Sequence, residues 1–199
     1  PSTEEIIPSL QPEMERVLTG FPKSSWLLVC PRACRTLEVF AHERGYRHAS
    51  PPADLCHWLN HKANFFKGLD HLQLRRLPGR WLRLRRNRFT EIHSEFGGRF
   101  VLQAPRGFTG SGTAIVDSER DYAEAGQRLG DTEVWAAPYL GPLSLNINAF
   151  AMASRTAVSY PSVQLDGLEM LGARPGMYCG NDFTSTALLP KQIVENVQE

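Results

Sequence analysis

A glycine-rich segment at residues 103–113 holds the residues with the clearest capacity for chemistry. It contains three glycines within six residues, Gly107, Gly110 and Gly112. Glycine permits positive φ angles and lets backbone N–H groups approach a ligand, as in loops that cover phosphates. Apolar runs at 100–102 and 114–116 flank the segment. Neither the Lys-Ser/Thr of a Walker loop nor a helix start follows the last glycine, so the pattern predicts the tip of a β-hairpin. Taken alone, a hairpin that only turns the chain is the simpler interpretation.

Two other sets of cations could meet an anionic ligand. Lys62 lies within an apolar stripe at 55–69 that is typical of a helix, where a lysine is more often a solvated charge. Residues 75–88 contain seven arginines. An alternating strand at 81–85 with its arginines in water accounts for this stretch, and an anion-attracting rim or a nucleic-acid surface is the alternative. The formal net charge of +1 disfavours nucleic acid.

Composition places the chain among ordinary globular proteins. Of its 199 residues, 42% are hydrophobic and 22% are charged. No apolar run approaches the ~20 residues of a membrane-spanning helix, and the first residues lack the features of a signal peptide. We therefore expect a soluble, cytoplasmic protein without a membrane segment. The cysteines at 30, 34, 56 and 179 have no paired CxxC spacing, which disfavours a zinc site or a disulfide framework.

Periodicity and punctuation predict an α/β fold with mixed sheets. Residues 1–23 read as a loose lead-in with one short helix near residues 14–18, and 167–180 as a glycine-rich loop. Strands are expected at 26–30, from 46, and at 81–85, 100–102, 114–116, 133–137, 144–150, 155–160 and 162–165. Helices are expected at 37–45, 55–69, 89–96, 117–129 and near 193–197.

Four short motifs stand out against this order of elements. They are Asn-His-Lys-Ala-Asn-Phe at 60–65, the strand and glycine segment at 100–113, Glu-Val-Trp-Ala-Ala-Pro-Tyr-Leu at 133–140, and Tyr-Pro-Ser-Val-Gln-Leu at 160–165. Together they resemble the ATP-grasp superfamily over roughly residues 24–199, most nearly its carboxylate–amine ligases and biotin carboxylases. The resemblance implies a lead-in at 1–23, part of a preceding strand–helix domain at 24–70, and the first ATP-grasp lobe with the start of the second at 71–199.

The resemblance also implies a site that binds ATP and Mg²⁺. Lys62 and Gln103 would reach the phosphates, with Arg106 sharing the charge, and the hinge strand would flank adenine. Gln164 would lie near the ribose or phosphates. The loop residues expected over the triphosphate are Gly107, Gly110, Gly112 and Thr113, and the hinge residues are Ala137, Pro138, Tyr139 and Leu140. The implied substrates are a small-molecule carboxylate and an amine, and a homodimer is compatible with this assignment.

The sequence departs from the family pattern at several positions. Gln103 stands where the family has a lysine, and a neutral amide can donate a hydrogen bond but carries no charge. Residues 136–138 are Ala-Ala-Pro where acidic residues are common, and Asn146 and Asn148 stand in place of a carboxylate. The Glu and Glu-x-Asn of the metal site are missing from 167–199, where Asp182 is the nearest acidic residue. We therefore expect either an active ligase that continues past residue 199 or a non-catalytic binding or assembly module.

Overall fold

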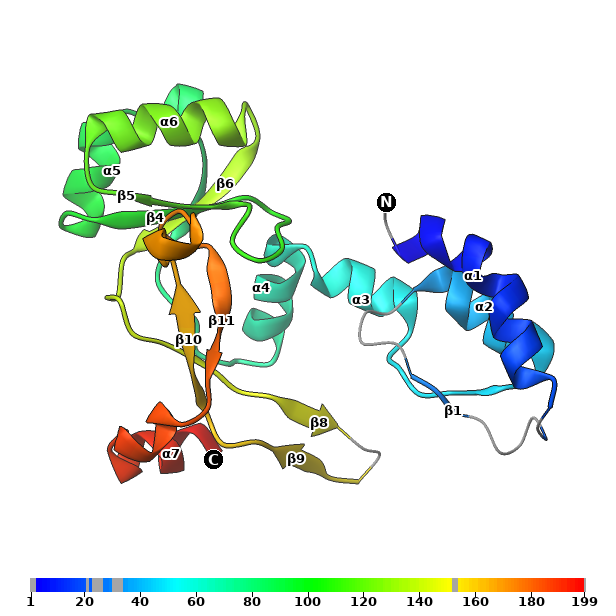
Figure 1. Ribbon diagram of the computed structural model, residues 1–199. Coiled ribbons are helices and arrows are strands. Elements are labelled where there is room, and N and C mark those ends of the chain that lie inside the picture. The colour runs from blue at the N-terminus through cyan, green and yellow to red at the C-terminus, as the bar shows by residue number, and fades with distance from the viewer. Residues whose placement is uncertain (1–2, 21, 23–26, 30–33, 152–153, 199) are drawn as a thin grey trace. The chain divides into compact units, whose positions relative to one another are not determined.

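The computed structural model describes residues 3–20, 22, 27–29, 34–151 and 154–198. The chain divides into two compact units, Pro1–Arg76 and Leu77–Glu199, which are described separately below (Figure 1). Among the described residues, no helix is both long and apolar enough to cross a membrane.

The first unit is built around a β-α-β arrangement. Its elements are α1 (Thr3–Leu18), β1 (Leu27–Leu28), α2 (Arg35–Arg44), β2 (Arg47–His48), α3 (Ala53–Leu59) and α4 (Lys62–His71). Strands β1 and β2 pair in parallel, and α2 connects them. Gly45 ends α2 in a left-handed conformation with φ of 71°, as expected from the sequence. The small core of this unit contains Leu18, Leu37 and Phe40.

Two sequence predictions for this unit are wrong. The lead-in at 1–23 is mostly one long helix, α1, even though Pro8 and Pro12 lie inside it. Met14 and Leu18 pack on the core, and this tertiary packing offsets the cost of the prolines. The stripe at 55–69 is two helices, because His61 is extended between α3 and α4. Of the strand predicted at 26–30, Leu27–Leu28 is confirmed as β1, and residues 26 and 30 lie outside the described residues.

The second unit begins with a four-stranded antiparallel sheet in the order β3-β6-β4-β5. Helices α5 and α6 lie on one face of this sheet (Figure 1). Phe100, Ile92 and Val134 are fully buried in the core between these layers. The bounds are β3 (Arg80–Arg83), η2 (Leu84–Arg86), α5 (Phe89–Phe96), β4 (Phe100–Gln103), β5 (Thr113–Val116), α6 (Glu119–Leu129) and β6 (Glu133–Pro138).

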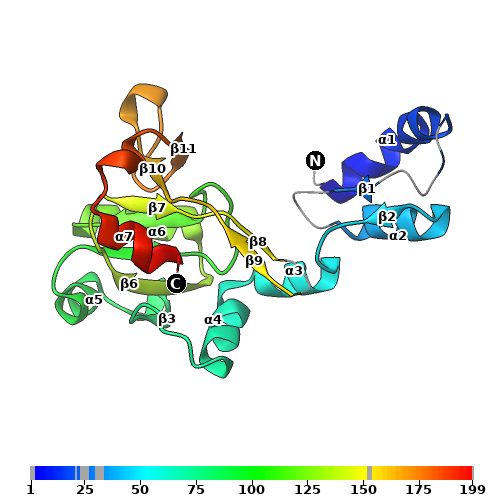
Figure 2. The same ribbon diagram turned by 90° about the horizontal axis from the view of Figure 1, so that it is seen from below.

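A second antiparallel sheet follows in the order β11-β10-β7. A separate hairpin, β8–β9, extends beyond this sheet (Figures 1 and 2). The bounds are β7 (Ser144–Asn146), β8 (Ala149–Ala151), β9 (Thr156–Val158), β10 (Ser162–Asp166), η3 (Glu169–Leu171), β11 (Tyr178–Asp182), η4 (Ser185–Leu188) and α7 (Lys191–Gln198).

Three predictions in this unit need correction. The strand at 144–150 is two strands in different sheets, because the chain leaves β7 before Asn148, whose N–H bonds Ser159 Oγ. The loop at 167–180 contains η3 and most of β11, whose ladder partner β10 the local pattern does not reveal. The strand at 81–85 ends at Arg83 and tightens into η2, where the Leu84 carbonyl accepts hydrogen bonds from Tyr122 Oη and Asn87 N.

Candidate functional site

The glycine-rich segment forms the tip of the β4–β5 hairpin, as predicted. Gln103 pairs with Thr113 at the end of the ladder, and Ala104 N donates to Gly112 O at 2.8 Å beyond it. Inside the loop, Ser111 N donates to Phe108 O and Thr113 N donates to Gly110 O, each at 3.0 Å. Residues 104–112, termed the glycine hairpin below, therefore have a defined conformation rather than an open turn.

Two other elements hold the glycine hairpin. Arg128, in the last turn of α6, donates to Ser111 O at 2.9 Å and to Thr113 O at 2.8 Å. The turn between β10 and β11 lies beside the hairpin (Figure 1), and Tyr178 N donates to Thr109 O at 3.3 Å. Within the part of the chain that the structure describes, the N–H groups of Gly107, Gly110 and Gly112 donate no hydrogen bond. Backbone amides of this kind can bind an anion.

Gln103 and Arg106 lie at the base of this hairpin. Gln103 is half-buried on the sheet face away from α5 and α6, between Thr113 on β5 and Trp135 on β6. Its side chain makes no hydrogen bond to any described residue, so the amide remains available to a ligand. Arg106 is exposed. On the same face, the Trp81 and Trp135 rings meet edge to face at a centroid distance of 5.5 Å.

The predicted hinge consists of the last two residues of β6 and the two residues that follow it. Ala137 is buried opposite Val101, and Tyr139 N donates to Arg99 O at 3.1 Å. The Arg99 guanidinium lies 5.4 Å from the centre of the Tyr139 ring. Leu140 is 70% exposed, and its backbone makes no hydrogen bond within the described chain. Leu140 thus presents a donor and an acceptor that could pair with the edge of a flat heterocycle. Pro138, between Ala137 and Tyr139, is half-buried and has no N–H to contribute.

Gln164 lies on β10 in the second sheet, opposite Asn181 and Ser144. Its side-chain nitrogen donates to both carboxylate oxygens of Asp166 at 3.0 and 2.9 Å, so only its carbonyl remains for a ligand. Asn181 was not anticipated from the sequence. Its Nδ2 donates to Tyr178 Oη at 3.0 Å, and its buried Oδ1 has no partner among the described residues.

The described residues do not fit a magnesium site. Among them, no group of three or more His, Cys, Asp or Glu side chains could hold a metal ion. The carboxylate of Asp182 is already engaged in hydrogen bonds at the start of η4. Its Oδ1 accepts from Thr184 N at 2.7 Å and from Ser185 N at 3.1 Å. Hydrogen bonds from the Ser185 and Thr184 hydroxyls, and then from their backbone N–H groups, hold the pKa of Asp182 well below its usual range.

Lys62 belongs to the first unit, where it is the first residue of α4. It is half-buried, and this burial lowers the pKa of its ammonium group. The other predicted nucleotide-binding residues belong to the second unit, so the contact of Lys62 with the same nucleotide stays a prediction.

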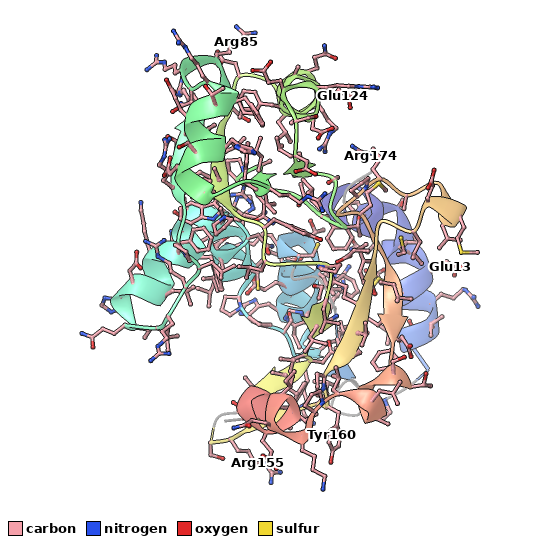
Figure 3. All side chains as sticks on the ribbon, turned by 90° about the vertical axis from the view of Figure 1, so that its left-hand side faces the viewer. Glu13, Arg85, Glu124, Arg155, Tyr160 and Arg174 are labelled. Carbon is pink, nitrogen blue, oxygen red and sulfur yellow. The ribbon has the colours of Figure 1, made fainter. Side chains whose placement is uncertain are left out.

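The arginines of residues 75–88 lie in exposed or half-buried positions, several of them near acidic side chains. Arg80 Nε lies 2.9 Å from Glu95 Oε2, and Arg85 lies 3.8 Å from Asp131. Arg85 on η2 points away from the sheet into solvent (Figure 3). Trp81 is half-buried rather than displayed on the surface. Exposed arginines are compatible with both the solvated strand and a nucleic-acid surface, so the preference for the solvated strand stays a prediction.

Comparison with known proteins finds similarity in structure alone, since no protein-family model and no curated protein sequence matches the chain. An ADP complex of purK, an N5-carboxyaminoimidazole ribonucleotide synthetase, aligns with a TM-score of 0.59 and 14% identity, over 82% of this chain and 41% of that one. A β,γ-ATP complex of biotin carboxylase from Campylobacter jejuni aligns with a TM-score of 0.57 and 13% identity, over 82% of this chain and 37% of that one. D-alanine–D-alanine ligase from Bacillus anthracis aligns with a TM-score of 0.55 and 12% identity, over 81% of this chain and 53% of that one.

The chain thus spans between 37% and 53% of the length of these three structures. At 12–14% identity the similarity concerns the fold. Over most of its length, the chain has the fold of ATP-grasp enzymes.

Proposed function

We propose that this chain is the nucleotide-binding part of an ATP-dependent ligase that joins a carboxylate to an amine. The observation that carries this proposal is the glycine hairpin within an ATP-grasp fold. Three glycine amides there have no acceptor among the residues that the structure describes, while carbonyls of the same loop accept hydrogen bonds from Arg128 and Tyr178. Such an arrangement supports binding of a phosphate chain.

The roles follow from where each group lies. Gly107, Gly110, Gly112 and Thr113 cover the triphosphate in this proposal, with Gln103 donating to a phosphate oxygen from the base of the hairpin. Arg106 supplies the positive charge that Gln103 lacks. Residues 137–140 flank adenine, and the exposed Leu140 backbone offers its donor and acceptor to the purine edge. Lys62 and Gln164 are the further proposed contacts, the first to phosphate and the second to ribose or phosphate.

The proposed reaction has two steps. A carboxylate oxygen attacks the γ-phosphorus of ATP, ADP leaves, and an acyl phosphate forms. The amine then attacks the carbonyl carbon and inorganic phosphate leaves. Protein groups assist by positioning the reactants and by stabilising charge. Mg²⁺ would neutralise the phosphates, but the described residues do not supply its ligands, so we expect weak nucleotide binding and little turnover from these 199 residues alone.

A second candidate function is a non-catalytic module that keeps the fold for binding or assembly. Two observations favour it. Gln103 has no charge to offer a phosphate, and the Asp182 carboxylate is held by the η4 turn. Under this alternative the chain binds a partner or a second copy of itself, and nucleotide binding is weak or lost.

Titration calorimetry of the 199-residue chain with ATP and Mg²⁺ separates these functions. Gln103→Lys restores a point charge beside the hairpin, and one unit charge about 4 Å from a phosphate at a solvated site should tighten ATP binding by roughly tenfold. Gln127→Lys adds the same charge at an exposed position of α6 and should change the affinity little. Failure of both the wild type and Gln103→Lys to bind ATP even at millimolar concentrations, where weak binding is still detected, would exclude the nucleotide-binding function and favour the module.

A further inference from the structure

The contact between α6 and the glycine hairpin suggests a role that the nucleotide proposal does not contain. We propose that Arg128 is a positioning residue, which fixes the hairpin so that the N–H groups of Gly110 and Gly112 face an incoming anionic group. The anion that this arrangement suits is a phosphate of a nucleotide, so this part of the inference rests on the proposed function. The part of the inference that concerns the orientation of the hairpin rests on the hydrogen bonds of Arg128 and Tyr178 alone.

The guanidinium of Arg128 bridges two alternate carbonyls of one chain segment. Its two terminal nitrogens donate to Ser111 O at 2.9 Å and to Thr113 O at 2.8 Å. Thr113 is the first residue of β5, an edge strand of its sheet, and Ser111 lies two residues before it in the glycine hairpin. The planar fork of arginine can hold two acceptors at once, which a lysine ammonium does with less geometric control.

Peptide geometry converts these carbonyl contacts into an orientation of the amides. No described peptide bond is cis, so the C=O of Ser111 and the N–H of Gly112 point in opposite directions across one planar unit. A carbonyl held toward Arg128 therefore turns the Gly112 N–H away from α6. The Thr109 carbonyl, held by Tyr178 N at 3.3 Å, turns the Gly110 N–H away from β11 in the same manner.

Packing around Gly110 shows that the hairpin is held at a defined place. A Cβ at this residue would lie 2.0 Å from Gly176 O, so the backbone of the β10–β11 turn touches the hairpin directly. Gly176 in turn packs on the Thr113 side chain, 3.3 Å from the position of its own virtual Cβ. Arg128 from α6 and the β10–β11 turn thus contact different parts of the hairpin.

The surroundings of Arg128 also favour an anion. Arg174 lies on the β10–β11 turn and points into the region beside α6 (Figure 3). Burial, and then the positive charge of Arg174, lower the pKa of Arg128. Two guanidinium groups near one loop raise the local positive potential, which supplies charge at the hairpin although Gln103 carries none.

Nuclear spin relaxation of the whole chain measures this role directly. In the wild type we expect backbone order parameters of about 0.8 for Gly110 and Gly112, and in Arg128→Gln we expect them to fall below about 0.6. Arg128→Lys should recover part of the order, because one ammonium still reaches a carbonyl. The matched control is Arg120→Gln, which removes an exposed α6 arginine paired with Glu124. It should leave both glycines unchanged.

The same variants are then titrated with two ligands. Arg128→Gln should raise the Kd for ATP about fivefold and leave the Kd for adenosine unchanged, because only the phosphates meet the hairpin. Unchanged order parameters in Arg128→Gln would overturn the proposal, as would an equal loss of order in Arg120→Gln or in the α6 amides. Loss of order with an unchanged ATP affinity would overturn the role in binding. If wild type binds no ATP, the proposed function fails, and the relaxation data alone decide whether Arg128 orients the hairpin.

Discussion

Replacing Gly110 by alanine tests how closely the glycine hairpin packs against the β10–β11 turn. Gly110 has φ of 78°, a left-handed conformation that costs an L-residue about 1–2 kcal/mol. The new Cβ would also lie 2.0 Å from Gly176 O and 2.8 Å from the Met177 Cα. Both neighbours are backbone atoms, so a side-chain rotation cannot relieve the overlap, and the two loops must separate.

The cost of that separation is limited by the contacts it breaks. The hydrogen bond from Tyr178 N to Thr109 O joins the two loops and contributes about 0.5–1.5 kcal/mol when formed. With the strain at φ included, we expect Gly110→Ala to lower the free energy of unfolding by about 1.5–3.5 kcal/mol.

Urea unfolding of the variant beside Gly126→Ala provides the measurement. Gly126 lies in α6, where a Cβ would meet no atom within 4 Å. Alanine there should raise the free energy of unfolding by about 0.5–1 kcal/mol, because it restricts the unfolded chain and favours helix. The reasoning is refuted if Gly110→Ala is as stable as wild type while Gly126→Ala shows its expected gain.

The remaining predictions concern the stability of the core around Phe100 and the pH dependence that Asp182 confers. Phe100 is fully buried against aromatic neighbours that include Phe89, so Phe100→Ala should destabilise the protein by about 3–5 kcal/mol in urea unfolding. Phe150 is 65% exposed, and Phe150→Ala should change stability by no more than about 0.5 kcal/mol. The folded-state pKa of Asp182 is lowered, so its contribution to stability is present above the ordinary pKa of about 4 and is lost as the pH falls from there through the folded pKa. The melting temperature of Asp182→Ala should therefore fall less than that of wild type between about pH 5 and pH 2, and an equal fall would contradict this assignment.

The first sheet of the second unit was largely predictable because local and tertiary preferences agree there. Residues Phe89–Phe96 form a helix that ends at Gly97 with φ of 72°, as the sequence indicates. In β4, Phe100 and Leu102 face the core while Val101 and Gln103 face away, which is the alternation of a half-buried strand. The alternation of a strand and the glycine that ends a helix are local features, so they can be recognised in a single sequence.

The missed elements depend on partners that are distant in the chain. Strand β11 carries Gly180, with φ of 149°, and polar residues at its end, so its own pattern resembles a loop until β10 is placed beside it. The two prolines of α1 predict a broken helix, and only the docking of Met14 and Leu18 on the core accounts for its length. Arg128 gives no sequence signal either, because an arginine in the last turn of a helix is common.

The glycines themselves are weaker evidence for a nucleotide than their number suggests. Packing requires Gly110, beside Gly176 O, and also Gly112, where a Cβ would lie 3.0 Å from Ala104 Cβ and 3.1 Å from Arg106 O. A hairpin that only turned and packed would need glycine at these positions too. Packing does not account for the hydrogen bonds of this loop. The carbonyls at 109, 111 and 113 each accept a hydrogen bond, whereas the N–H groups of Gly110 and Gly112 have no acceptor in the described chain. An anion would supply the missing acceptor for these two N–H groups. The Arg128 variants, rather than glycine substitutions, therefore distinguish a phosphate-binding hairpin from a packed turn.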